Sequence, residues 1–64
     1  MKASELKVGD VITTTYQLHG GVVTSQVTII KVEVNPFGHI IADAETPDGS
    51  IAQLQYMADE ELQG

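Results

Sequence analysis

Two short segments of the same form constrain the fold more than any other feature of the sequence. They read Asn35-Pro36-Phe37-Gly38-His39 and Thr46-Pro47-Asp48-Gly49-Ser50. Proline presets the backbone angle φ of the first turn position, and glycine accepts the left-handed conformation that follows it. Each segment therefore predicts a hairpin with a loop of about three residues, a type I turn closed by a bulge.

The residues that flank these loops define the register of the two hairpins. Because side chains alternate between faces, a slip of one residue would move every side chain to the opposite face. With Pro-x-Gly as each loop, the rows on one face are all apolar or aromatic: Val34, Ile40 and Tyr56; Val32, Ala42 and Leu54; Ile30, Ala44 and Ala52. The rows on the other face are mostly polar: Glu33, Ile41 and Gln55; Lys31, Asp43 and Gln53. The pattern predicts one buried and one solvated face.

A further hairpin is indicated upstream, where residues 11–18 and 22–34 are rich in Val, Ile, Thr and Tyr and flank His19-Gly20-Gly21. A loop made of Gly20 and Gly21 places Leu18 opposite Val23, Thr14 opposite Val27 and Ile12 opposite Ile29. The buried positions then change from odd to even numbers within the long second strand. We therefore expect a bulge or sharp bend near residues 28–30.

The two ends of the chain are short. Leu6 and Val8 precede a turn at Gly9-Asp10, and we expect both side chains to pack beneath the sheet. Residues 57–62 allow one helical turn, with Asp59 as its cap and Leu62 as an apolar plug.

The opening Leu6-Lys7-Val8-Gly9-Asp10-Val11-Ile12, followed by a bent long strand and several short ones, resembles the SH3-like small β-barrels. The resemblance implies a single all-β domain over residues 1–64, a five-stranded barrel of antiparallel hairpins with a bent long second strand and a short C-terminal turn. That superfold includes peptide-binding modules, translation-associated domains and small phage or plasmid proteins, so it implies no single activity. SH3 domains grip proline-rich ligands with a shelf of aromatic residues, whereas the aromatic residues here are only Tyr16, Phe37 and Tyr56. In size, acidity and lack of cysteine the chain looks most like a small phage or mobile-element accessory protein.

The charge of the chain bears on its partners. Nine acidic residues, three lysines and no arginine give a formal net charge of −6. A nucleic-acid binder normally carries a basic surface that neutralises phosphates, so nucleic acid is an unfavoured partner, and anionic membranes are disfavoured for the same reason. No apolar stretch approaches the length of a membrane span, and the first five residues lack the apolar core of a signal peptide. We expect a cytoplasmic protein.

Catalytic and metal-binding chemistry finds little support in the residues. His19 and His39 are the only side chains suited to act as a base near neutral pH, and they fall on different hairpins. No serine has the context of a nucleophile, and no cysteine is present. Asp43 and Glu45 alternate along a strand and Asp48 is a turn-forming residue, so the three do not converge as calcium ligands do. We therefore expect no enzyme, no metal and no cofactor.

The most favoured function is a non-enzymatic protein-binding module that acts through its acidic outer sheet or through a strand edge, with a protein partner that is basic. Steering by a field of one sign supports this interpretation, although the carboxylates also suit a purely solvated face. The candidate contact residues are Phe37, Ile41, Asp43, Glu45, Ile51, Gln53 and Gln55. Two alternatives remain open: a self-assembling structural or accessory subunit that forms a homo-oligomer, and a nucleic-acid-associated barrel.

Overall fold

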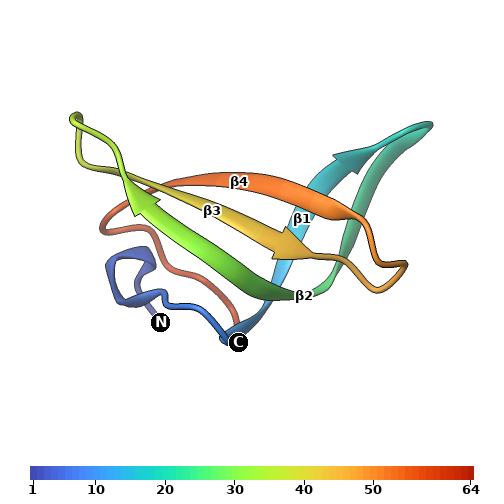
Figure 1. The fold of residues 1–64 in the computed structure, drawn as a ribbon, viewed down its shortest axis with the longest axis horizontal. Helices are drawn as coiled ribbons and strands as arrows, with labels where there is room; N and C mark the ends of the chain where they lie inside the picture. Colours follow the sequence, from blue (N-terminus) through green and yellow to red (C-terminus); the bar gives the residue numbers. More distant parts are fainter.

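The computed structural model describes all residues from 1 to 64 and contains one antiparallel sheet (Figure 1). Its elements are a short 3₁₀ helix, η1 (Ala3–Glu5), and the strands β1 (Val11–Leu18), β2 (Gly21–Val34), β3 (His39–Glu45) and β4 (Ile51–Met57). The strands lie in the order β1-β2-β3-β4, so each pairs with its neighbour in sequence. The long strand β2 bends, and the sheet curls into a half-barrel that remains open between β1 and β4.

The all-β class is confirmed, but the prediction of a five-stranded closed barrel is wrong, because the structure has four strands. The terminal segments supply only isolated bridges, Lys2 with Glu61 and Thr13 with Gln63. A single bridge fixes too few backbone groups to form a strand that would join β1 to β4. No helix in the structure has the length and apolar character needed to cross a membrane.

Both proline-glycine turns have the predicted geometry. In the first, the Gly38 amide donates to the Asn35 carbonyl at 3.0 Å, and the Asn35 amide donates to the His39 carbonyl at 3.0 Å. In the second, the Gly49 amide donates to the Thr46 carbonyl at 2.9 Å. Gly38 and Gly49 have φ values of +83° and +87°, which is the left-handed region that glycine enters without steric cost.

The second turn carries a polar network around Asp48. The Asp48 carboxylate accepts a hydrogen bond from the Thr46 hydroxyl and another from the Ser50 amide, the latter at 3.0 Å. These bonds, that of Thr46 first, hold the pKa of Asp48 below its ordinary value of 3.8. Because Thr46 is buried, the network also satisfies the hydroxyl of the one polar residue in the interior.

The pairing of β3 with β4 agrees with the predicted register in every row, from His39 opposite Met57 to Glu45 opposite Ile51. The pairing of β2 with β3 agrees from Val34 opposite Ile40 as far as Lys31 opposite Asp43. The predicted bulge is confirmed, since the register shifts between Ile29 and Lys31.

The bulge corrects one predicted row. Ala44 lies opposite Ile29, not opposite Ile30. Ile30 is the extra residue of the bulge and is 45% exposed, whereas Ile29 is fully buried. The predicted register of β2 with β3 therefore begins at Lys31, one residue later than the predicted row of Ile30 and Ala44.

The predicted register of β1 with β2 is wrong by two residues. Leu18 pairs with Gly21 and Ile12 with Val27, so that the loop consists of His19 and Gly20. Gly20 has a φ of +92°, and His19 has an ordinary negative φ. This turn needs a left-handed residue only at its second loop position. A loop of His19 and Gly20 meets that need, because the glycine occupies the second position. A shift of two residues keeps each side chain on its predicted face, so Ile12, Tyr16 and Val27 are buried as expected.

The core lies in the concavity of the sheet and contains both terminal segments. Its buried apolar members are Ala3, Leu6, Ile12, Tyr16, Val27, Ile29, Ile40, Ala42, Ala44, Leu54 and Leu62. Leu62 is thus the predicted plug, and Leu6 packs as predicted. Val34, by contrast, is 65% exposed, because it stands at the end of the sheet beyond the core.

The structure corrects two expectations about the ends. Val8 is exposed, because it lies in a turn in which the Asp10 amide donates to the Lys7 carbonyl at 3.1 Å. Residues 57–62 contain no helical turn capped by Asp59. They form a tight turn, with the Glu60 amide donating to the Met57 carbonyl at 3.0 Å, and then extend so that the Leu62 amide reaches the Met1 carbonyl at 2.7 Å.

Candidate functional site

Six of the seven predicted contact residues lie together on the outer face of the sheet. They form three cross-strand pairs: Ile41 with Gln55, Asp43 with Gln53, and Glu45 with Ile51. The seventh, Phe37, stands apart at the tip of the β2–β3 turn and is 84% exposed. The structure thus gathers the residues of β3 and β4 and separates them from Phe37.

An ion pair borders this outer face. The Lys31 ammonium lies 3.0 Å from the Glu33 carboxylate, and both side chains are well exposed. The hydrogen bond to Glu33, with the charge of that carboxylate, raises the pKa of Lys31 above its ordinary value of 10.5. Exposed pairs of this kind contribute little to stability. The face around them, with Ile41, Asp43 and Gln53, is only a shallow hollow of about 40 Å³.

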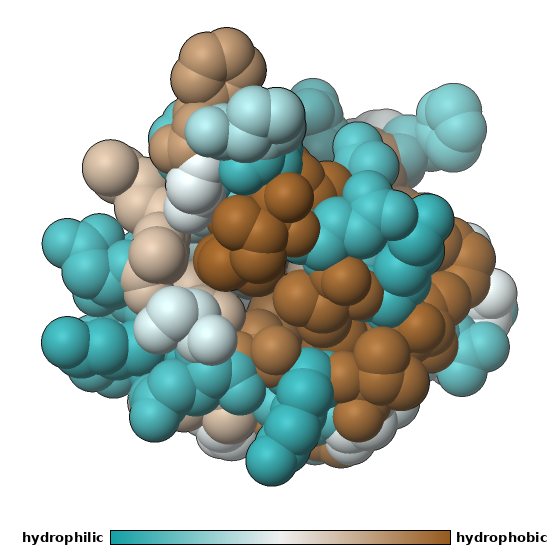
Figure 2. Space-filling model, turned by 60° about the vertical axis from the view of Figure 1, so that its left-hand side comes forward, coloured by the Kyte–Doolittle hydropathy of each residue, from teal (hydrophilic) through white to brown (hydrophobic).

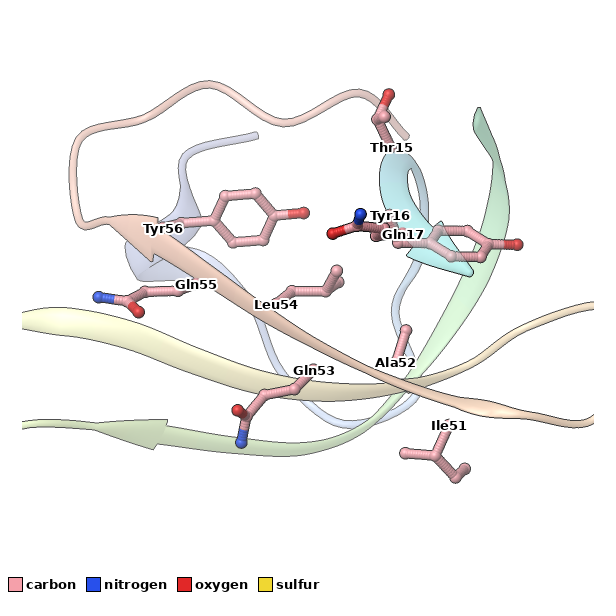
Figure 3. A pocket seen from close by; sticks show the side chains of 9 residues that line it. All are labelled: Thr15, Tyr16, Gln17, Ile51, Ala52, Gln53, Leu54, Gln55 and Tyr56. Carbon is pink, nitrogen blue, oxygen red and sulfur yellow. The ribbon is translucent and has the colours of Figure 1, made fainter. Parts of the chain in front are cut away.

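A larger concavity lies where the half-barrel is open. This β4-edge groove has a volume of about 410 Å³ and runs between β4 and the C-terminal half of β1 (Figure 3). Its lining residues are Thr15, Tyr16, Gln17, Ile51, Ala52, Gln53, Leu54, Gln55 and Tyr56. Figure 3 shows the ring of Tyr56 reaching from β4 toward β1, and the side chain of Leu54 pointing to the same side of its strand.

Two tyrosines hold the walls of the groove in place. The Tyr56 hydroxyl lies 2.6 Å from the Thr14 hydroxyl, which joins β4 to β1 at one end of the groove. The Tyr16 hydroxyl lies 2.6 Å from the Ser25 hydroxyl and joins β1 to β2. Both phenols are part-buried and hydrogen-bonded, so the rings combine an apolar surface with a satisfied polar tip.

The outer edge of β4 presents unpaired backbone groups to this groove. Thr46 and Ser50 form a hydrogen-bonded pair at the turn, with 2.8 Å between the Thr46 amide and the Ser50 carbonyl. Since hydrogen-bonded and non-hydrogen-bonded pairs alternate along an antiparallel ladder, the amide and carbonyl groups of Ile51, Gln53 and Gln55 point away from β3. No backbone hydrogen bond outside the strand ladders involves these groups.

The same alternation applies to β1. The Thr13 amide donates to the Gln63 carbonyl at 2.7 Å, so the odd-numbered residues of β1 direct their backbone groups away from β2. Thr13 is occupied by this bridge, whereas the backbone groups of Thr15 and Gln17 have no backbone partner. Free polar groups therefore line both margins of the groove.

The histidines lie apart from each other. His39 Nδ1 is 3.2 Å from the Gln55 side-chain amide, and His19 is exposed in the β1–β2 loop. The structure contains no group of three or more His, Cys, Asp or Glu side chains that could hold a metal ion.

Only part of this groove is made of residues that the sequence predicts as contact residues. The sequence predicts Ile51, Gln53 and Gln55 as contact residues of the outer sheet or of a strand edge, and in the structure the β4 edge that they form borders the groove. The wall supplied by Thr15, Tyr16 and Gln17 was missed, because β1 is separated from β4 by two strands in the sheet. A count of only four strand-forming segments would have indicated this wall, because a sheet of four strands leaves a gap between its first and last strands.

Comparison with protein-family models, with curated proteins and with solved structures finds no match to this chain.

Proposed function

We propose that this chain is a non-enzymatic protein-binding module, a four-stranded half-barrel related to the SH3-like small barrels, that binds an extended segment of a partner protein along the β4 edge. The observation that carries the proposal is the combination of a free strand edge with a concave floor. The edge offers the backbone groups of Ile51, Gln53 and Gln55, and Leu54 and Tyr56 line the floor beside it.

An added strand would gain affinity and selectivity from different parts of this site. Its backbone would pair with the free amide and carbonyl groups, as in other cases of strand addition. Its alternate side chains would enter the groove. From Ile51 to Gln55 the edge spans about 13 Å at the usual strand rise, which is room for a segment of about five residues.

The charge of the chain favours a basic partner segment. The net charge is −6, and the groove continues past Tyr56 into a hollow of about 430 Å³ that is lined by Glu60 and Glu61. A positively charged segment that extends along β4 would approach these carboxylates. Complementary charge increases the association rate and disfavours acidic competitors.

A synthetic peptide tests the proposal directly. The probe is a seven-residue peptide of alternating lysine and valine with blocked ends, and its counterpart has glutamate in place of lysine. In a ¹H–¹⁵N NMR titration we expect the lysine peptide to shift the amide signals of Ile51, Gln53 and Gln55 first. The glutamate peptide is expected to bind more weakly.

A proline variant of the edge provides the matched control. Gln53→Pro removes an amide that points away from β3, so the ladder survives, and affinity for the lysine peptide is expected to fall about fivefold, the worth of one net hydrogen bond. Gln26→Pro makes the same change on β2, at an amide that points away from β1, and is expected to leave the affinity unchanged. Equal affinity of the wild type and Gln53→Pro, or signal shifts confined to another surface, would contradict the proposal.

A further inference from the structure

A second free edge lies on the C-terminal half of β2. The pairing with β1 stops at Val11 opposite Thr28. The next residue, Ile29, is covered on this side by the preceding loop, since the Gly9 amide donates to the Ile29 carbonyl and the Ile29 amide to the Asp10 carbonyl, each at 2.8 Å. Beyond Ile29, β2 has a strand partner only in β3.

The backbone groups along this edge can be assigned from the adjacent turn. The hydrogen bond from the Asn35 amide to the His39 carbonyl marks that pair as hydrogen-bonded. By alternation, Val34 opposite Ile40 and Val32 opposite Ala42 are non-hydrogen-bonded pairs, so Val32 and Val34 direct their amide and carbonyl groups away from β3. No hydrogen bond outside the ladder occupies them.

Exposed apolar side chains accompany this edge. Ile30, Val34 and Phe37 are exposed, as is Val8 next to Gly9. Figure 2, which brings the left-hand end of Figure 1 forward, shows a continuous apolar area at the end of the molecule that contains the β2–β3 turn. An unpaired edge beside an apolar surface is a site of association, because natural proteins otherwise protect such edges.

The sequence of this edge, Ile30-Lys31-Val32-Glu33-Val34, is complementary to itself when reversed. We infer that the edge pairs with the same edge of a second copy of this chain, antiparallel about a two-fold axis at Val32. In that register Lys31 of each chain faces Glu33 of the other, and Ile30 faces Val34. Val32 faces itself as a hydrogen-bonded pair, which is the pair type that its outward backbone groups require.

The attraction between the paired charges acts over a shorter distance than the repulsion between the two chains, and this difference favours the pairing. Two chains of charge −6 repel each other as wholes, but at physiological ionic strength the screening length is about 8 Å. Side chains directly opposite each other on paired strands are only about 5 Å apart, well inside that length. The local attraction of Lys31 for Glu33 therefore survives while most of the long-range repulsion is screened.

Charge reversal tests both the partner and the register. Lys31→Glu places two pairs of like charges across the axis, and Glu33→Lys does the same with the opposite sign, so each variant alone is expected to associate at least about tenfold more weakly than the wild type. An equimolar mixture of the two restores both ion pairs. Sedimentation equilibrium from micromolar to millimolar concentration is expected to show a one-to-one dimer in that mixture, and native mass spectrometry is expected to show that it contains one copy of each variant.

Two further variants complete the experiment. The double variant Lys31→Glu/Glu33→Lys is expected to dimerise like the wild type, which also shows that the reversed charges permit folding. Asp59→Lys, which changes the net charge as Glu33→Lys does but lies in the turn after β4, is expected to leave dimerisation undiminished. A wild type that stays monomeric at every concentration, or single variants that associate as strongly as the wild type, would overturn the inference. Neither result would bear on the β4 edge.

Discussion

Replacing Ile29 by alanine is expected to lower the free energy of unfolding by about 3 kcal/mol, while the same replacement of Ile30 costs less than about 1 kcal/mol. Ile29 is fully buried and Ile30 is 45% exposed, although the two are adjacent in β2. The truncation at Ile29 removes three buried carbons and leaves a cavity, whereas solvent already reaches the side chain of Ile30.

The loss expected for Ile29→Ala is a large part of the total free energy of unfolding, so it is readily measured. A domain of this length has an unfolding free energy of only about 3–10 kcal/mol. A loss of about 3 kcal/mol would lower the melting temperature by about 15 °C. Thermal unfolding of both variants in dilute solution, followed by circular dichroism, measures the difference. Equal destabilisation by the two replacements would mean that the bulge is misplaced.

Leu62→Ala is expected to cost about 2–3 kcal/mol, although the residue is third from the end of the chain as it stands. The Leu62 side chain is buried in the core, and its amide donates to the Met1 carbonyl at 2.7 Å. Loss of this side chain removes apolar contacts from the core and loosens the segment that covers it.

The neighbouring residue supplies the control for this replacement. Gln63 is exposed, and its carbonyl accepts from the Thr13 amide, a bond that Gln63→Ala retains. We therefore expect Gln63→Ala to change the unfolding free energy by less than about 0.5 kcal/mol in urea denaturation. A Leu62→Ala variant as stable as Gln63→Ala would show that the terminal segment does not complete the core.

The parts of the fold that the sequence predicts best are those that local chemistry determines. Pro36 and Gly38 specify a turn, and the turn specifies the register of the strands on either side. The β1–β2 loop lacks proline and has two adjacent glycines, so more than one turn is sterically open and the predicted register was wrong by two residues. The hydrophobic pattern could not correct that error, because a shift of two residues preserves the faces.

The groove could not be predicted in the same way, because it arises from the curvature of the whole sheet. Tyr16 and Leu54 meet only because β2 bends at its bulge and brings β1 round toward β4. The sequence indicated the bend but not its extent. The prediction of a fifth strand also failed for a non-local reason, since residues 61–63 pair through isolated bridges rather than a ladder.

Amide hydrogen exchange measures the openness of the β4 edge, on which the proposed function depends. In the free protein we expect fast exchange at Ile51, Gln53 and Gln55 and slow exchange at Ala52, Leu54 and Tyr56, whose amides pair with β3. Saturation with the lysine–valine peptide is expected to slow the three fast amides and leave the others unchanged. Protection of Gln53 and Gln55 as strong as that of Leu54 in the free protein would contradict an open edge, and with it the proposed binding site.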